Sequence, residues 1–153
     1  MSEIKTGVNP VNEIQFGVCV SGRKTSDTAE EIVTTTVKDA ESLSISINGQ
    51  IQEWNPMDAA GWGRKLMTAK SISISMGGKR NYGDAGNDYV AGLAWKNGQD
   101  CNSWMSITFP NGDKLIIPCV INVTSLGGDS TAVDALSWEA LSDGKPTYVP
   151  YAA

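Results

Sequence analysis

The sequence contains no histidine among its 153 residues. Histidine is the side chain used most often as a general base and as a metal ligand, so its absence argues against catalysis and against a metal or other cofactor. Cysteine is also scarce. Cys19, Cys101 and Cys119 are odd in number and form no Cys-x-x-Cys pair, so we expect buried free thiols rather than disulfides.

Positive charge is in short supply as well. The formal net charge is −5 and the isoelectric point is near 4.6, which argues against nucleic-acid binding as the purpose of the chain. No apolar run approaches the length that spans a bilayer, and the first residues lack the blocks of a signal peptide. A hydrophobic content of 41% indicates a globular protein. We expect a flexible N-terminal arm over 1–14 and a single domain over 15–153.

Glycine-rich stretches at 61–65 and 77–80 have neither the spacing nor the strand-to-helix context of a phosphate-binding loop. Turn glycines explain them better. Asp84, Asn87 and Asp88 surround Gly86 without calcium-loop spacing, so capping of a helix is the better interpretation.

The strongest local signal is a hairpin around 110–113 (Pro-Asn-Gly-Asp), which separates two β-branched and aromatic runs within 103–124. A two-residue turn would place Phe109 opposite Lys114 and Ile107 opposite Ile116. The apolar pattern therefore favours a three-residue, bulged turn with Gly112 in the left-handed region. We expect three pairs across it: Phe109 with Leu115, Ile107 with Ile117, and Met105 with Cys119.

The second arm of that hairpin is apolar on both faces near its start, because Ile116 and Val120 lie on the face opposite Ile117 and Cys119. A strand of this kind is covered on both sides.

Further strands are predicted by alternation of apolar and polar residues. They cover 14–20, the stretch beginning at 32–38, 71–76, and a last strand over 132–141. Residues 42–51 alternate Ser with Leu or Ile and form either one long strand or a hairpin bent at 48–49.

Two short helices are predicted. Asn55-Pro56 opens the first, with Trp62, Leu66 and Met67 facing inward. The second spans 86–95 and ends at Asn97-Gly98.

The strands around 42–52 and 71–76 carry no charge or proline, although exposed edge strands normally carry such protection against pairing. Either other strands of the chain cover them, or the protein pairs with copies of itself.

The ordered segments resemble the major tail tube proteins of long-tailed bacteriophages over nearly the whole chain. The similarity is carried by 78–90 after a Ser/Ile strand, by the hairpin at 107–113, and by 123–130 before a final strand. It implies a mainly β fold, a β-sandwich or split barrel of the tail tube type with one or two short helices. Contractile-tail tubes and related injection machines share that fold.

The resemblance also implies a function. The protein would be a structural subunit of the virion tail, made in the host bacterial cytoplasm and self-assembling into stacked hexameric rings. Neighbouring sheets would join into a hollow conduit through which DNA passes without specific binding. Its partners would be itself and other tail proteins, such as the tape measure, the tail terminator and baseplate components.

Ring contacts would fall on the 1–14 arm and the 21–31 loop, and ion pairs between subunits would complete them. The candidate interface residues are Arg23, Lys24, Asp27, Lys79, Arg80, Asp84 and Asp88.

Two other functions stay open. A small β-sandwich could bind carbohydrate through tryptophan platforms, although apolar spacing is more often that of core residues. The candidates are Trp54, Trp62, Trp95, Trp104 and Trp138. A hydrolase acting through paired carboxylates is the least supported.

Overall fold

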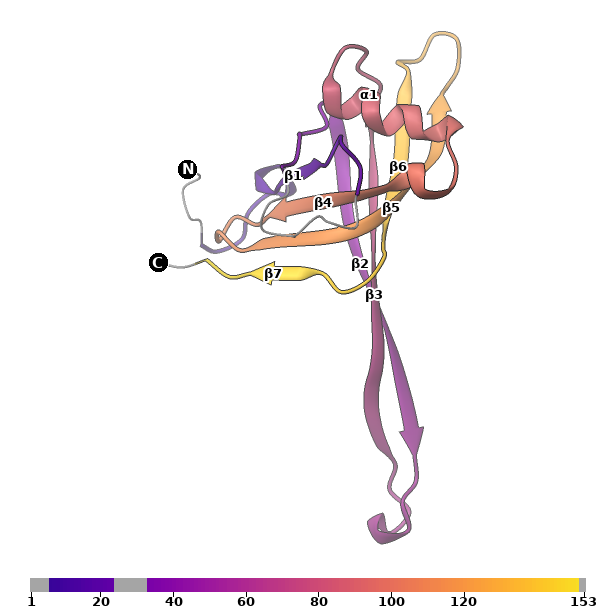
Figure 1. The fold of residues 1–153 in the computed structure, drawn as a ribbon. Coiled ribbons are helices and arrows are strands. Elements are labelled where there is room, and N and C mark those ends of the chain that lie inside the picture. The colour runs from indigo at the N-terminus through magenta and orange to yellow at the C-terminus, as the bar shows by residue number, and fades with distance from the viewer. Residues whose placement is uncertain (1–5, 24–32, 152–153) are drawn as a thin grey trace.

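The computed structural model describes residues 6–23 and 33–151, and within them the fold is mainly β, as predicted. Seven antiparallel strands form one sheet in the order β1-β4-β5-β6-β3-β2, with β7 paired to β5 (Figure 1). The strands are β1 (Gln15–Val18), β2 (Ala40–Trp54), β3 (Arg64–Lys79), β4 (Asn102–Thr108), β5 (Lys114–Gly127), β6 (Ala135–Ser142) and β7 (Thr147–Val149).

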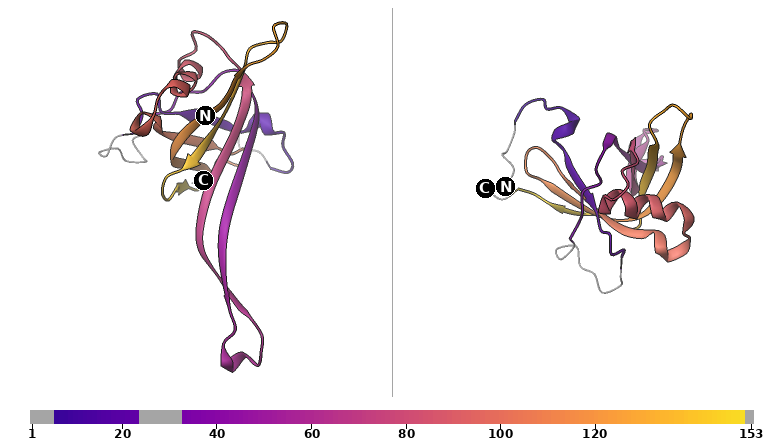
Figure 2. Two further views of the ribbon diagram at one scale, coloured as in Figure 1. Left: turned by 90° about the vertical axis from the view of Figure 1, so that its right-hand side faces the viewer. Right: turned by 90° about the horizontal axis from the view of Figure 1, so that it is seen from above.

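The sheet folds over on itself to make the two layers of the body. Figures 1 and 2 show β1, β4 and β7 running across the direction of β2, β3 and β6. Strand β5 belongs to both layers: its first half pairs with β4 and β7, and its second half pairs with β6. A register shift between Val123 and Ser125 lies in that second half, and such bulges let a strand bend between layers.

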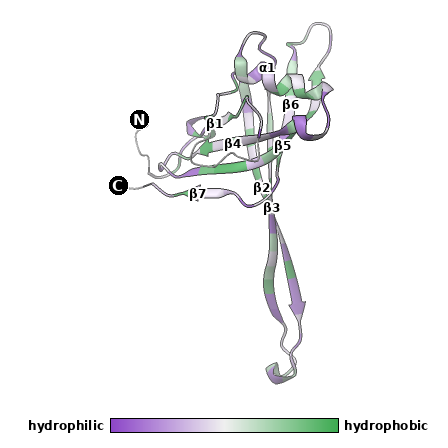
Figure 3. Ribbon diagram, in the orientation of Figure 1, coloured by the Kyte–Doolittle hydropathy of each residue, from purple (hydrophilic) through white to green (hydrophobic). Residues whose placement is uncertain are grey.

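The core lies between the two layers, and alternation along the strands explains it. Ile107, Ile117 and Ile121 come from the β4–β5 layer, and Ile74 and Trp138 come from β3 and β6; each is at most 3% exposed. Figure 3 shows the apolar segments of β4 and β5 gathered in this body. Successive strand residues point to opposite faces, so one face of each layer supplies the core.

The central hairpin has the predicted bulged turn. Gly112 has φ +94°, its N–H donates to the carbonyl of Phe109 over 2.9 Å, and the N–H of Phe109 donates to the carbonyl of Asp113 over 2.8 Å. The predicted pairs were wrong by two residues. Ile107 lies opposite Leu115 and Met105 opposite Ile117, because the loop closes at Asp113 instead of Leu115. A shift of two residues leaves the same side chains on the same face.

Both faces of β5 are covered near its start, as predicted: Ile116 is 4% exposed and Ile117 is 1% exposed. On the Ile116 face, the Oγ atoms of Thr34 and Ser106 lie 2.7 Å apart, and Ser106 is paired with Ile116.

The helix predicted over 86–95 is present as α1 (Ala85–Gly92) followed by the 3-10 turn η4 (Leu93–Trp95). The side chain of Asp84 caps it by accepting a hydrogen bond from the N–H of Asn87 over 3.0 Å. Val90 and Leu93 join the core, so α1 closes one end of the body.

Three other predictions were wrong. The helix after Asn55-Pro56 is only a 3-10 turn, η3 (Met57–Ala59), and β3 follows from Arg64. The described part of 32–38 forms no strand beyond one bridge between Thr35 and Val18. β6 is not the last strand, because β7 follows it. The remaining short elements are η1 (Val11–Glu13) and η5 (Gly98–Cys101).

Candidate assembly surface

The β2–β3 hairpin extends far beyond the body as a two-stranded ribbon (Figure 1). Strand β3 pairs with β6 only over 73–79, and β2 is the last strand of the sheet. Within the described residues, the outer edge of β2 and the outer edge of β3 over 64–72 therefore have no partner strand. An isolated two-stranded hairpin is at best marginally stable in water, so the part of the ribbon beyond β6 is held only by the pairing of β2 with β3.

One face of the ribbon continues the apolar face of the core. Its pairs are Leu43 with Met76, Ile45 with Ile74 and Ile47 with Ile72. Exposure rises along this face: Ile74 is fully buried, Ile47 is 65% exposed and Ile51 is 56% exposed. We call Ile47, Ile51 and Met67 the apolar stripe. Lys70, paired with Gly49, lies on the same face between them, and the stripe is largely uncovered within the described residues.

A bulge keeps this stripe on one face. Gln50 pairs with Ala69 while Ile51 pairs with Met67, so Thr68 is an extra residue in β3. If Thr68 were instead paired regularly with Ile51, Met67 would lie on the opposite face. Gly49 completes the arrangement, because a Cβ atom there would lie 2.8 Å from the Sδ and Cε atoms of Met67.

The opposite face over the middle of the ribbon is polar and uncharged. It carries the pairs Ser44–Ser75, Ser46–Ser73, Asn48–Ser71 and Gln50–Ala69. We call it the serine face. A surface of hydroxyl and amide groups offers hydrogen bonds to water and carries no fixed charge.

The far end of the ribbon is again apolar. Met57 and Trp62 are 102% and 78% exposed, and Leu66 is 59% exposed. The guanidinium carbon of Arg64 lies 5.7 Å from the centre of the Trp54 ring, a cation–π contact that holds the two strands together near the end. We call Trp54, Met57, Trp62 and Leu66 the ribbon tip.

Sequence reasoning missed this ribbon end by assigning Trp62, Leu66 and Met67 to the buried face of a helix. The usable signal was the stretch 64–76, which has no proline or glycine and runs directly into the Ser/Ile alternation.

The charged candidates on the opposite side of the body have partners inside the subunit. Nη1 of Arg80 lies 2.7 Å from Oδ1 of Asp88, and this hydrogen bond is the main reason that the pKa of Asp88 is lowered. Asp84 caps α1 and also accepts from the N–H of Lys38 over 3.1 Å. Their role between subunits stays a prediction.

Two further candidates are also paired internally. Arg23 forms an ion pair with Asp143, and Nζ of Lys79 lies 3.1 Å from Oε1 of Glu41. Lys24 and Asp27 lie outside the described residues.

The five tryptophans do not form one platform. Trp138 is 3% exposed and belongs to the core, while Trp54 and Trp62 lie at the ribbon tip. Trp95 follows α1 at the other end of the molecule (Figure 1).

Groups suited to chemistry are not evident in the described residues. No group of three or more acidic, cysteine or histidine side chains there could hold a metal ion. The pKa values of Asp88 and Asp113 are lowered, whereas a general acid needs a raised pKa. The cysteines are free, as predicted, but only Cys19 and Cys119 are buried, whereas Cys101 is half-buried. Burial raises the pKa of Cys119 to about 12, which keeps its thiol protonated.

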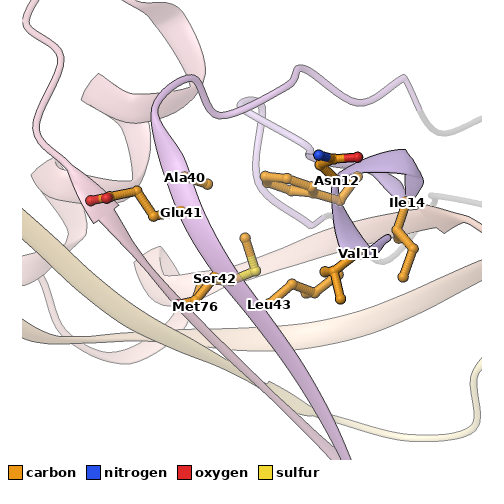
Figure 4. A pocket seen from close by; sticks show the side chains of 9 residues that line it. Val11, Asn12, Ile14, Ala40, Glu41, Ser42, Leu43 and Met76 are labelled. Carbon is orange, nitrogen blue, oxygen red and sulfur yellow. The ribbon is translucent and has the colours of Figure 1, made fainter. Parts of the chain in front are cut away.

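A small apolar pocket separates the N-terminal segment from β2. Figure 4 shows Val11 and Ile14 on one side of it and Leu43 and Met76 on the other, with Glu41 at the rim. Its volume is about 200 Å³, below the range of about 300–1,000 Å³ that small-molecule ligands usually occupy.

Comparison with solved structures identifies proteins of similar fold. One similar structure is the tail of an empty gene transfer agent (GTA) particle, refined helically with C6 symmetry; its TM-score is 0.71 and its identity is 14%. A second is the virion of the native GTA particle, with a TM-score of 0.72 and an identity of 14%. Each match covers 94% of this chain and 100% of the other. This chain has the fold of a GTA particle chain.

That finding confirms the fold which the sequence resemblance implies. No family model matches the chain, and no curated protein matches it significantly. Among the described residues, no helix is long and apolar enough to cross a membrane.

Proposed function

We propose that this protein is a structural subunit of a phage-type tail tube, assembling into hexameric rings that stack into a hollow conduit for DNA. The observation that carries the proposal is the β2–β3 ribbon. It combines two unpaired strand edges with an apolar stripe that is largely exposed within the described residues. Copies of the chain supply both requirements, because strand pairing between subunits removes the edges and packing of a neighbouring copy against the apolar face buries the stripe.

The structural neighbours support the same role. One of them is a particle tail with C6 symmetry, which corresponds to six equivalent positions around an axis. We infer that six copies of this chain occupy such positions. The virion tail is then its location, and its partners are its own copies together with tape measure, terminator and baseplate components. The role is structural and requires no catalysis.

The two faces of the ribbon have different roles in this assembly. The apolar stripe packs against protein, which leaves the serine face to line the conduit. DNA attracts lysine and arginine through counterion release, so a lining without cations lets it pass without being held. The net charge of −5 acts in the same direction.

Electron microscopy tests this proposal. The purified full-length protein is concentrated and imaged by negative stain, and particles from the source are labelled with an antibody against the chain. Stacked rings with six-fold symmetry, and label along the tail shaft, are expected. Monomers under every condition, together with tail shafts that carry no label, would refute it.

A further inference from the structure

The two ends of the molecule along the ribbon direction each expose a tryptophan-centred apolar surface. The ribbon tip forms one end, while α1 and the loop between β5 and β6 lie at the other (Figures 1 and 2). At this second end, Trp95 is 81% exposed, Tyr82 is 74% exposed and Val133 is 66% exposed. Large exposed apolar surfaces are typical of contact sites, so both ends are candidates for contact with another copy.

A groove lies at this second end. It is lined by the charged side chains of Arg80, Asp88 and Asp134 together with Tyr82, Trp95 and Leu126, and its volume is about 220 Å³. This is less than the roughly 300–1,000 Å³ of small-molecule pockets, so the groove suits an inserted protein side chain better than a separate ligand. We call it the helix groove.

The walls of the helix groove are held in place. The guanidinium carbon of Arg80 lies 4.1 Å from the centre of the Tyr82 ring, and the Tyr82 hydroxyl donates to Oδ2 of Asp134 over 3.2 Å. Arg80 in turn pairs with Asp88 of α1. A preformed groove binds with less loss of side-chain freedom than a mobile one.

Charge distinguishes the two ends. Residues 126–134, which form one side of the groove, contain Asp129 and Asp134 and no lysine or arginine. The ribbon tip carries both signs, because Glu53 and Asp58 lie close in sequence to Arg64 and Lys65. Arg64 and Lys65 are the cations at this end that could pair with Asp129 and Asp134.

From these features we propose that the ribbon tip of one copy inserts Trp62 and Met57 into the helix groove of the next copy along the tube. This inference rests on the proposed function. The two surfaces differ, so the contact is head-to-tail, and a head-to-tail contact that does not close on itself produces an open filament. The GTA tail, which was refined helically, has such a repeat along an axis.

A substitution at the ribbon tip tests the contact between stacked rings without changing the contacts within a ring. Trp62→Ser is expected to leave single rings intact and to raise the protein concentration needed for tubes at least tenfold. Val149→Ser, which changes an exposed apolar residue away from both ends, is the control and should assemble as the wild type does. Tubes of Trp62→Ser at wild-type concentration would overturn the inference. Wild-type protein that forms neither rings nor tubes would instead count against the proposed function.

Cross-linking identifies the contact while keeping both tryptophans. In a Cys101→Ser background, Met57→Cys and Val133→Cys are combined and the assembled tubes are treated with a bismaleimide. A ladder of covalent multimers is expected. The matched control combines Met57→Cys with Asn111→Cys on the β4–β5 turn and should give no ladder. No ladder from the first pair, or equal ladders from both pairs, would refute the contact between the ribbon tip and the helix groove.

Discussion

Nη1 of Arg80 lies 2.9 Å from Oδ1 of Asn87, and this contact joins the end of β3 to α1. Asn87 is 1% exposed and makes further hydrogen bonds that satisfy the carbonyls of Lys38 and Lys79 and the N–H of Asn81. One amide side chain thus connects the segment just before β2 and the end of β3 to the helix. The ribbon is fixed to the body at this point.

Asn87→Ala tests that connection. It leaves two carbonyls and the Arg80 guanidinium short of a partner, so we expect a loss of roughly 3 kcal/mol in the free energy of unfolding. Urea denaturation followed by tryptophan fluorescence measures it. Asn97→Ala, at an exposed position without a side-chain cap bond, is the control and should stay within about 0.5 kcal/mol of the wild type. Equal stabilities of the two variants would refute the role of Asn87.

Two glycines of α1 should respond oppositely to alanine. Helix propensity favours alanine over glycine by about 1 kcal/mol at either site. At Gly86, however, a Cβ atom would lie 2.5 Å from the carbonyl oxygen of Thr36, whereas at Gly92 nothing lies within 4 Å. We expect Gly86→Ala to lower the melting temperature and Gly92→Ala to raise it, as calorimetry would show. A rise for both would contradict the close approach of Thr36 to the helix.

Assembly should depend on Ile47 of the apolar stripe and not on the adjacent Ser46 of the serine face. Ile47→Asn and Ser46→Asn end in the same residue, but they change opposite faces of β2. Burial of one Ile is worth about 2 kcal/mol, which corresponds to a factor of about 30. We expect Ile47→Asn to raise the critical concentration for assembly at least tenfold by light scattering, and Ser46→Asn to leave it unchanged. Similar values for both would remove the stripe from the interface.

The serine face should tolerate amides but not cations. Six copies of Ser46→Lys would place a ring of positive charge in the conduit, so DNA release from particles is expected to slow at low salt and recover as salt rises. Ser46→Asn particles supply the control. DNA release that is independent of salt in intact Ser46→Lys particles would show that the serine face does not line the lumen.

Acid should loosen the C-terminal strand first. The hydroxyl of Tyr148 donates to Oδ2 of Asp113 over 2.5 Å, and this hydrogen bond is the main cause of the lowered pKa of Asp113. Because the folded-state pKa lies below the unfolded value of 3.8, the stabilisation is present above that value and is lost as pH falls through the folded pKa. Hydrogen exchange of 147–149 should therefore accelerate below about pH 4. Tyr148→Phe should weaken that dependence, and an unchanged profile would contradict it.

The sequence by itself determined most of the local structure. Alternation of apolar and polar residues predicted the strand at β1 and the Ser/Ile strands, and the Pro-Asn-Gly-Asp turn predicted the bulged hairpin. These features depend on neighbours in the chain, whose spacing is visible in sequence. For the same reason, the lack of charge and proline along the Ser/Ile strands was enough to suggest self-association.

The tertiary structure decided what each apolar residue faces. Trp62, Leu66 and Met67 suit a helix by composition, and only the pairing of β3 with β2 makes them exposed strand and turn residues. Likewise, Arg80 and Asp88 are ordinary surface charges in sequence, but the position of α1 brings them together within one subunit. Such contacts join residues through folding and not through spacing, so periodicity alone does not specify them.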